Sequence, residues 1–178
     1  MKATSPSSLS VSTTLCMYQI VFYNDSNHRL NYSTVVDNGL SGEIPKALRM
    51  LTQMNMLWLN RNAIGGTLPS ELEALTSLAR LDLSNNAISG AIPSEIGNLQ
   101  QLQEINMSVN LLSGQVPSEL STLPLLTNLW LDRNVLTGSV AAVCAAQSGI
   151  LLSADCDDVD CSCCAVCCDA NGVCEGSR

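Results

Sequence analysis

Eight of the nine cysteines in this 178-residue chain lie between residues 144 and 174. Thiols at this density either pair as disulfides, which form in oxidising compartments, or hold a metal such as zinc. The spacing Cys161-x-x-Cys164-x-x-Cys167 suits zinc, but adjacent cysteines and nearby aspartates do not match a familiar two-knuckle site. We therefore predict disulfides with no metal or cofactor, and keep bound zinc and a reactive thiol as alternatives. The disulfide candidates are Cys144, Cys156, Cys161, Cys163, Cys164, Cys167, Cys168 and Cys174.

The two tryptophans each stand three residues before an arginine, Trp58 before Arg61 and Trp130 before Arg133. Trp and Arg are strongly enriched among the residues that dominate binding energy at interfaces. This pattern favours a binding surface, whereas the alternative is that each Trp only packs on its neighbours or covers its own Arg. The predicted ligand-contacting residues are Trp58, Asn60, Arg61, Asp82, Asn106, Trp130, Asp132 and Arg133.

Residues that could perform catalysis do not form a recognisable constellation. His28 is the only histidine, and no periodic position offers it a nearby nucleophile. Glu71, Glu95 and Glu119 recur at a fixed phase where a short helical return begins, which the helix dipole explains without catalysis. The aspartates of residues 155–160 lack the spacing of an EF-hand loop. We therefore predict that the chain is not an enzyme.

The charge balance excludes several classes of partner. Eight basic residues stand against sixteen acidic ones, for a net charge of −8. Nucleic-acid binding needs clustered Lys and Arg, so no nucleic-acid partner is predicted. No apolar run is long enough for a membrane-spanning helix, so none is expected in this chain. The apolar stretch 15–23 is short for a secretory signal and lacks a small-residue cleavage site, so a signal peptide is not evident, and a truncated N-terminus is one interpretation.

A repeat of 24 residues determines where these side chains are placed. Asn recurs five times at one phase, and Gly follows each Asn four residues later. Pro follows seven residues after four of the five asparagines, and aliphatic residues occupy the phases between. A period of this length indicates stacked supersecondary units. The asparagines are Asn38, Asn62, Asn86, Asn110 and Asn134.

Each repeat has a physical interpretation. Alternation such as Leu81-Asp-Leu83 predicts a short strand with one buried face. The Asn side chain is expected to satisfy backbone groups of stacked coils, and Gly permits a corner that a Cβ would oppose. Pro then leads into a short helical return with Ser as its cap. Stacking buries the apolar side that a single repeat cannot bury alone. It also places Trp58 and Trp130 three strand spacings apart, or about 14 Å.

The pattern LxxLxxLxLxxNxLxGxIPxxLxxLxxL resembles the plant-type leucine-rich repeat. The resemblance implies an α/β solenoid: a right-handed curved superhelix with a parallel sheet on its concave face. It also implies a receptor-like recognition protein in extracellular signalling or defence. Alternatives are a secreted inhibitor of a microbial or wall-degrading enzyme, and an intracellular scaffold with reduced or metal-bound cysteines. The cysteine-rich tail is similar to those that follow extracellular arrays in algal, notably diatom, proteins.

We predict three regions and an extracellular or cell-surface location. Residues 1–29 form a degenerate or disordered segment that lacks the family's paired cysteines, 30–143 form about five repeats, and 144–178 form an acidic cap beginning with a Cys144–Cys156 disulfide. Asn24, Asn31 and Asn106 open glycosylation sequons. The expected ligand is a protein, peptide or glycan on the concave face, with a possible co-receptor.

Overall fold

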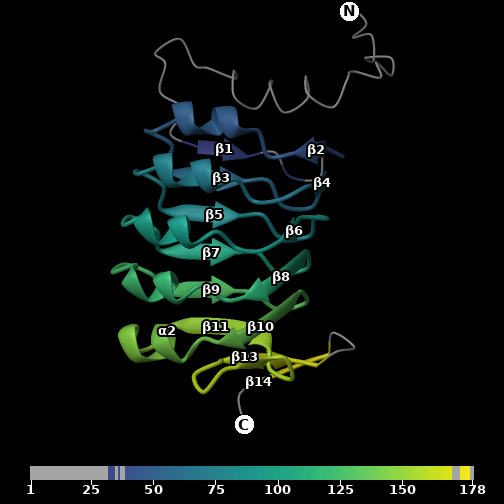
Figure 1. Ribbon diagram of the computed structural model, residues 1–178, viewed down its shortest axis with the longest axis vertical. Coiled ribbons are helices and arrows are strands. Elements are labelled where there is room, and N and C mark those ends of the chain that lie inside the picture. The colour runs from purple at the N-terminus through teal and green to yellow at the C-terminus, as the bar shows by residue number, and fades with distance from the viewer. Residues whose placement is uncertain (1–31, 35, 37–38, 170–172, 177–178) are drawn as a thin grey trace, which may run out of the picture.

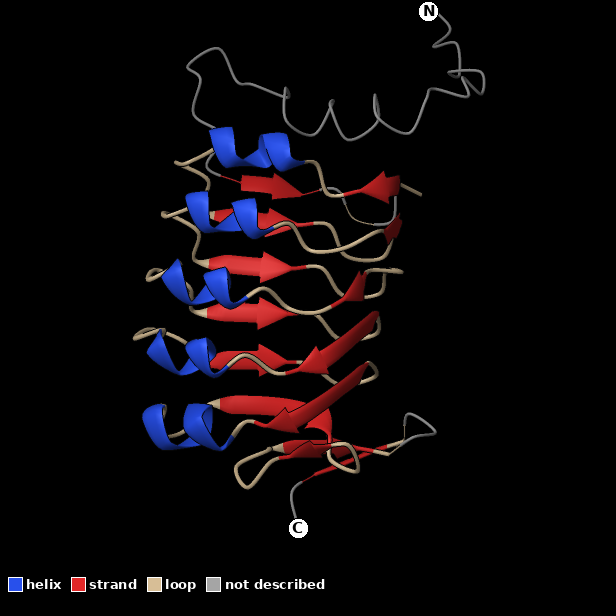
Figure 2. Cartoon of the chain, viewed as in Figure 1, coloured by secondary structure: helices blue, strands red, loops and turns tan. Residues whose placement is uncertain are grey.

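The computed structural model describes residues 32–34, 36, 39–169 and 173–176. The chain winds as a solenoid in which strands stack along one side and short helices along the other (Figures 1 and 2). Strands lie mainly in one parallel sheet, with two smaller sheets built from the second strand of each coil. The prediction of an α/β solenoid is confirmed.

The large sheet has eight strands in the order β1-β3-β5-β7-β9-β11-β13-β14, all parallel except the last pair. Their bounds are β1 Tyr32–Thr34, β3 Met56–Trp58, β5 Arg80–Asp82, β7 Glu104–Asn106, β9 Asn128–Trp130, β11 Leu151–Asp155, β13 Val166–Cys168 and β14 Cys174–Gly176. The smaller sheets contain β2 Ser41–Glu43 and β4 Ala63–Gly65, and then β6 Ser89–Gly90, β8 Leu111–Gln115, β10 Val135–Ser139 and β12 Val159–Asp160.

From β1 to β9 the strands of the large sheet pair at the repeat spacing of 24 residues, and β11 follows β9 at a spacing of 23, so the buried residues form straight columns. Leu57 pairs with Leu81, Leu81 with Ile105, Ile105 with Leu129, and Leu129 with Leu152. Each of these side chains is at most 1% exposed. Burial of one such side chain contributes about 1.5–3 kcal/mol, which makes the stack of aliphatic columns the main stabilising feature.

The second strands are displaced by two residues from one coil to the next. Ser89 pairs with Leu111, and Ser113 with Val135, where the repeat alone would pair equivalent residues. The five predicted glycine corners lie within these second strands or, for Gly66, directly after one, and all have positive φ between 70° and 97°. At Gly66 a Cβ would overlap the side chain of Glu43 from the preceding coil, so both space and backbone conformation require glycine there.

The return segments are single turns of 3-10 helix, followed in the last coil by one α-helix. They are η1 Lys46–Met50, η2 Ser70–Ala74, η3 Ser94–Asn98, η4 Ser118–Thr122 and α2 Ala141–Ala146. The prediction that Ser caps these turns was wrong. Pro69, Pro93 and Pro117 occupy the cap positions in extended conformation, and no side-chain cap hydrogen bond forms. Proline fixes φ there, so the turn begins without a hydroxyl acceptor.

The asparagine ladder forms as predicted. Asn86 accepts a hydrogen bond at Oδ1 from the N–H of Ile64, and donates through Nδ2 to the carbonyls of Leu83 and Leu59, at 3.0 Å each. Equivalent bonds to the preceding coil hold Asn62, Asn110 and Asn134. Each amide therefore ties two coils together at backbone groups that would otherwise be buried without partners. Asn38 lies outside the described residues.

The cysteine-rich tail closes the C-terminal end of the stack. Strand β11 pairs with β9 in register, and β13 and β14 extend the same sheet. The predicted Cys144–Cys156 disulfide was wrong, because α2 places Cys144 against Cys163. The four disulfides are Cys144–Cys163, Cys156–Cys167, Cys161–Cys164 and Cys168–Cys174. Every cysteine of the predicted set is paired.

Candidate concave binding face

Trp58 and Trp130 lie in one column on the outer face of the large sheet. The register joins Trp58 to Asp82, Asp82 to Asn106, and Asn106 to Trp130. Both tryptophans are half-buried, and the leucines beside them in the strand point into the core. Three strand spacings separate the two indoles, or about 14 Å. The strands thus present two aromatic side chains on one surface with two polar side chains between them.

A second outer column was missed in the sequence. It begins each strand two residues before the Trp58 column, and contains Met56, Arg80, Glu104, Asn128 and Leu151. Arg80 Nε lies 3.5 Å from a carboxylate oxygen of Glu104, and Leu151 is 53% exposed. The alternation of the strand carried the signal, because residues two apart share a face.

The polar side chains between the tryptophans are held by their own strands. Asp82 Oδ1 accepts hydrogen bonds from the Ser84 N–H at 3.0 Å and from the Ser84 hydroxyl at 2.7 Å. Asn106 Oδ1 accepts the same pair of bonds from Ser108, at 3.1 and 2.8 Å. One carbonyl or carboxylate oxygen on each side chain is therefore already engaged, which limits the rotamers that a ligand would meet.

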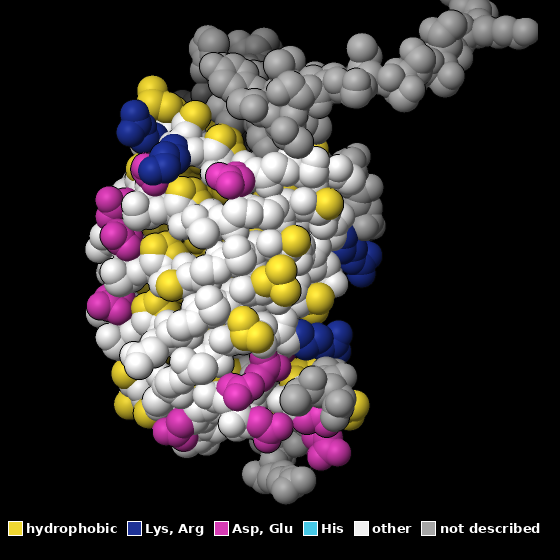
Figure 3. Space-filling view, turned by 45° about the vertical axis from the view of Figure 1, so that its right-hand side comes forward, with side chains coloured by type: hydrophobic (Ala, Val, Ile, Leu, Met, Phe, Trp, Pro, Cys, Tyr) yellow, Lys and Arg dark blue, Asp and Glu magenta, His cyan; other side chains and the backbone are white. Residues whose placement is uncertain are grey.

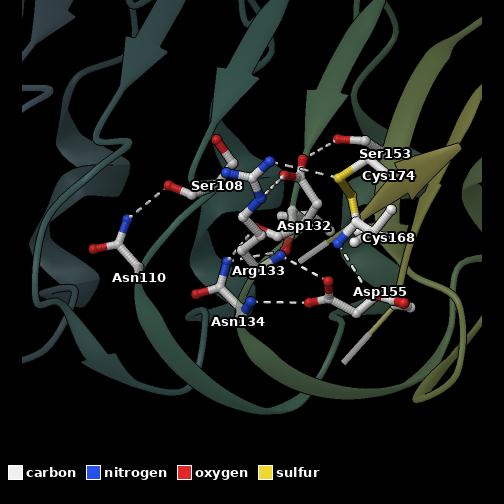
Figure 4. Close-up of polar contacts among 12 residues, drawn as sticks. Ser108, Asn110, Asp132, Arg133, Asn134, Ser153, Asp155, Cys168 and Cys174 are labelled. Carbon is white, nitrogen blue, oxygen red and sulfur yellow. Dashed lines mark hydrogen bonds and ion pairs between the residues drawn. A yellow bond between two sulfur atoms is a disulfide. The ribbon is translucent and has the colours of Figure 1, made fainter. Parts of the chain in front are cut away.

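Asp132 and Arg133 connect this face to the cap (Figure 4). Asp132 Oδ1 accepts a short hydrogen bond from the Ser153 hydroxyl, and its other oxygen lies 4.0 Å from Arg133 Nε. Arg133 Nη2 in turn lies 3.8 Å from the sulfur of Cys174 on β14. The cap thus helps to position the arginine that follows Trp130.

Arg61 and Arg133 lie three residues beyond the ends of β3 and β9 and do not belong to these strands. Both have left-handed backbone conformation with φ of 57°, and Asn85 and Val109 at the same phase have φ of 56° and 57°. Each coil turns sharply at this residue just before the ladder Asn. Both arginine side chains are exposed, and they emerge at the edge of the concave sheet beside Asn60 and Asp132.

Asp155 ends the backbone ladder that runs beneath this face. In earlier coils the N–H groups of the turn residue and of Asn donate to carbonyls of the next coil, as Val109 does to Asp132. At the last coil the carboxylate of Asp155 accepts both bonds, from Arg133 N–H at 2.7 Å and Asn134 N–H at 2.9 Å. Burial raises the pKa of Asp155 above its ordinary value of 3.8, against the opposing effect of these two donors.

The neighbouring face over β6, β8 and β10 has a different character. Segments 63–69, 87–93, 111–117 and 135–143 contain no charged residue. Figure 3 shows this side as a largely white surface with scattered apolar side chains. Leu111 in β8 and Val135 in β10 are exposed. Charged and aromatic groups together occur on the concave sheet, which therefore remains the better candidate for a specific polar ligand.

The other candidate features are in the cap or outside the described residues. A cavity of about 470 Å³ is lined by cysteines 156, 161, 164, 167 and 168 together with Asp157, Ser162, Asp169, Val173 and Glu175. Asn24, Asn31 and His28 lie outside the described residues. Across the described part of the chain, helices are too short to cross a bilayer.

Comparison with known proteins agrees with this geometry. The leucine-rich repeat family model matches residues 77–99 and 101–123. The chain is 30% identical to the BIR2 ectodomain from Arabidopsis thaliana, with a TM-score of 0.68, over 78% of this chain and 71% of that one. The plant peptide hormone receptor RGFR1 in complex with RGF2 gives 30% identity and a TM-score of 0.67 over 74% of this chain. No curated protein sequence matches significantly.

This chain therefore belongs to the leucine-rich repeat family, and it is of the plant type. It spans only 20% of the RGFR1 chain. A plant ice-binding protein is also similar, at 31% identity and a TM-score of 0.63, over 73% of this chain and 45% of that one. Since proteins with different ligands share the fold, a function must be argued from the site.

Proposed function

We propose that this chain is a noncatalytic recognition module that binds a protein or peptide segment on its concave sheet. The observation that carries the proposal is the single column of Trp58, Asp82, Asn106 and Trp130. Half-buried indoles offer large apolar area at low entropic cost, and they are the side chains that most often dominate binding energy. An extended peptide of about four residues spans the 14 Å between them.

The polar groups around the column suit a peptide better than a purely apolar surface would. Asp82 and Asn106 are held in fixed rotamers by their own serines, so they are preorganised acceptors and donors for a main chain. Arg61 and Arg133 at the edge of the sheet are suited to carboxylates of a ligand. The similarity to a peptide hormone receptor supports this assignment.

The wider role that we propose is receptor-like recognition outside the cell, in signalling or defence. Four disulfides support an oxidising location, because such bonds persist in extracellular compartments. The resemblance to the BIR2 ectodomain supports the receptor-like part, together with a possible co-receptor.

The test is selection of a displayed library of linear peptides on the oxidised full chain. Enriched peptides are then titrated against Trp58→Ala, Trp130→Ala and the double variant. We expect each truncation to weaken binding about tenfold or more, because hot-spot residues contribute about 1–2 kcal/mol or more. Met50→Ala and Leu111→Ala are matched controls, since both side chains are exposed and apolar but lie outside this sheet face.

Thermal unfolding of every variant separates loss of binding from loss of folding. The proposal fails if no peptide binds the wild type above a leucine-rich-repeat protein without the two tryptophans. It also fails if a folded double variant keeps the affinity of the controls.

A further inference from the structure

Two disulfides of the cap lie against one another and gather their sulfur atoms. The sulfurs of Cys156, Cys164 and Cys167 all lie within 4.8 Å of each other. Cys156 is bonded to Cys167, and Cys161 is bonded to Cys164. Two disulfides therefore place three sulfur atoms within 4.8 Å of one another and hold the fourth, that of Cys161, next to them through its bond to Cys164.

We propose that, when these two disulfides are reduced, Cys156, Cys161, Cys164 and Cys167 bind one Zn²⁺. Zinc takes four thiolates at about 2.3 Å in a tetrahedron, which places the sulfurs about 3.8 Å apart. Once each disulfide is broken, its two sulfurs must separate by nearly 2 Å to reach that arrangement, because a disulfide bond is about 2 Å long. Three of the ligands follow the Cys-x-x-Cys-x-x-Cys spacing that zinc sites use.

The position of the cluster explains how a bound ion would stabilise the cap. Cys164 is 5% exposed and belongs to the hydrophobic core, while Cys156, Cys161 and Cys167 pack against it. The disulfides hold this layer over the open end of the stack, which a solenoid must cover. Without them, zinc would join the turn after β11 to the segment that leads into β13. The same cap would thus close in either an oxidising or a reducing compartment.

The chemistry balances with a dithiol as reductant. Each disulfide accepts two electrons and two protons and becomes two thiols, while the dithiol becomes a disulfide. Zn²⁺ then forms four Zn–S bonds, and the thiol protons pass to solvent. The nearby Asp157, Asp169 and Glu175 attract the cation, but they oppose the negative charge that four thiolates leave on the site.

A neighbouring disulfide provides a competing set of ligands. Cys161 also lies within 4.8 Å of Cys144 and Cys163 in sulfur-to-sulfur distance. The set that we propose uses only sulfurs of residues 156–167, whereas the competing set needs Cys144 from α2. Paired substitutions distinguish the two sets, because they share only Cys161.

The experiment titrates Co²⁺, and then Zn²⁺, into the full chain reduced with a phosphine. We expect one Co²⁺ per chain with the visible bands of tetrahedral thiolate coordination, and their loss when Zn²⁺ displaces it. The Cys156→Ser/Cys164→Ser variant should lose these bands. The Cys144→Ser/Cys163→Ser and Cys168→Ser/Cys174→Ser variants should keep them, because they leave all four proposed ligands in place.

Thermal unfolding of the reduced chain decides whether the ion belongs to the folded cap. Zinc should raise the midpoint of unfolding in the wild type and in both control variants, but not in Cys156→Ser/Cys164→Ser. The proposal is overturned if the reduced wild type shows no tetrahedral bands or if the two proposed ligands can be removed without loss. Binding that leaves the unfolding midpoint unchanged would also overturn it, since the metal would then be held by unfolded thiols.

Discussion

Replacing Asp155 by alanine removes the acceptor for the last two turn amides of the backbone ladder. The Arg133 and Asn134 N–H groups donate to this carboxylate at 2.7 and 2.9 Å. In the preceding coils the same two donors find backbone carbonyls, so only this end of the solenoid depends on a side chain. The side chain is 7% exposed, so water cannot readily take its place.

The expected loss of stability is about 2–4 kcal/mol. A backbone donor left without an acceptor costs about 1–3 kcal/mol, and two donors are affected. Two such donors would cost about 2–6 kcal/mol together, and we expect the lower part of this range. The reason is that Arg133 is exposed, so its N–H can recover part of its hydration. Asp155→Asn keeps one side-chain oxygen as an acceptor, and should lose roughly half as much.

Urea unfolding of wild type, Asp155→Ala and Asp157→Ala measures this effect. Asp157 is an exposed aspartate two residues away, so its replacement controls for a change of net charge in the cap. Hydrogen exchange locates the loss, because the amides of Arg133 and Asn134 should exchange faster in Asp155→Ala only. The reasoning is refuted if the free energy of unfolding changes by less than about 0.5 kcal/mol and both amides keep their protection.

The pKa of Asp155 adds a dependence on pH with a definite sign. Burial raises it above 3.8 in the folded chain, so the folded state favours the protonated carboxyl more than the unfolded state does. Its contribution to stability is therefore fully present below pH 3.8 and declines as the pH rises through the folded pKa. Relative to Asp155→Asn, which does not titrate, the wild type should lose stability across that window. Parallel pH profiles for the two proteins would contradict this.

Three further predictions concern the repeat itself. Asn110→Ala should cost about 2–4 kcal/mol in urea unfolding, because this buried amide hydrogen-bonds four backbone groups, whereas exposed Asn98→Ala should cost under about 0.5 kcal/mol. Gly97→Ala should lower stability by about 1–3 kcal/mol, since its Cβ would lie 2.8 Å from the Glu119 carbonyl oxygen; an unchanged midpoint would contradict this. Secretion from a eukaryotic host should leave the Asn106 sequon unmodified, because a glycan there would occupy the proposed peptide column; a mass that an amidase removes and that Asn106→Gln lacks would contradict this.

The columns of the concave sheet were predictable because their cause is local and repeated. Each strand alternates buried and exposed residues, and the period of 24 residues brings Trp58 and Trp130 to equivalent places. The role of Asn86 was predictable for the same reason, since a turn that stacks on copies of itself presents the same backbone groups every time. The outer column that begins with Met56 was also present in the alternation, although it was overlooked.

Features at the end of the stack could not be predicted in this way, because no repeat continues there. Neither the pairing of Cys144 with Cys163 nor the two bonds accepted by Asp155 has an equivalent in the earlier coils. Both depend on the path by which the chain folds back over the last buried layer. The capping prediction for Ser70 failed for a different reason, since the preceding proline already fixes the start of the turn.

The sequence by itself determined the solenoid, its period, its buried columns and the shared face of its two tryptophans. These follow from spacing alone, because identical units that cannot bury their own apolar side must stack on one another. The tertiary structure decided the disulfide partners, the staggered register of the second strands and the contact between Arg133 and Cys174. These contacts join residues that come together only when the whole chain has folded, so the spacing of residues in the sequence does not predict them.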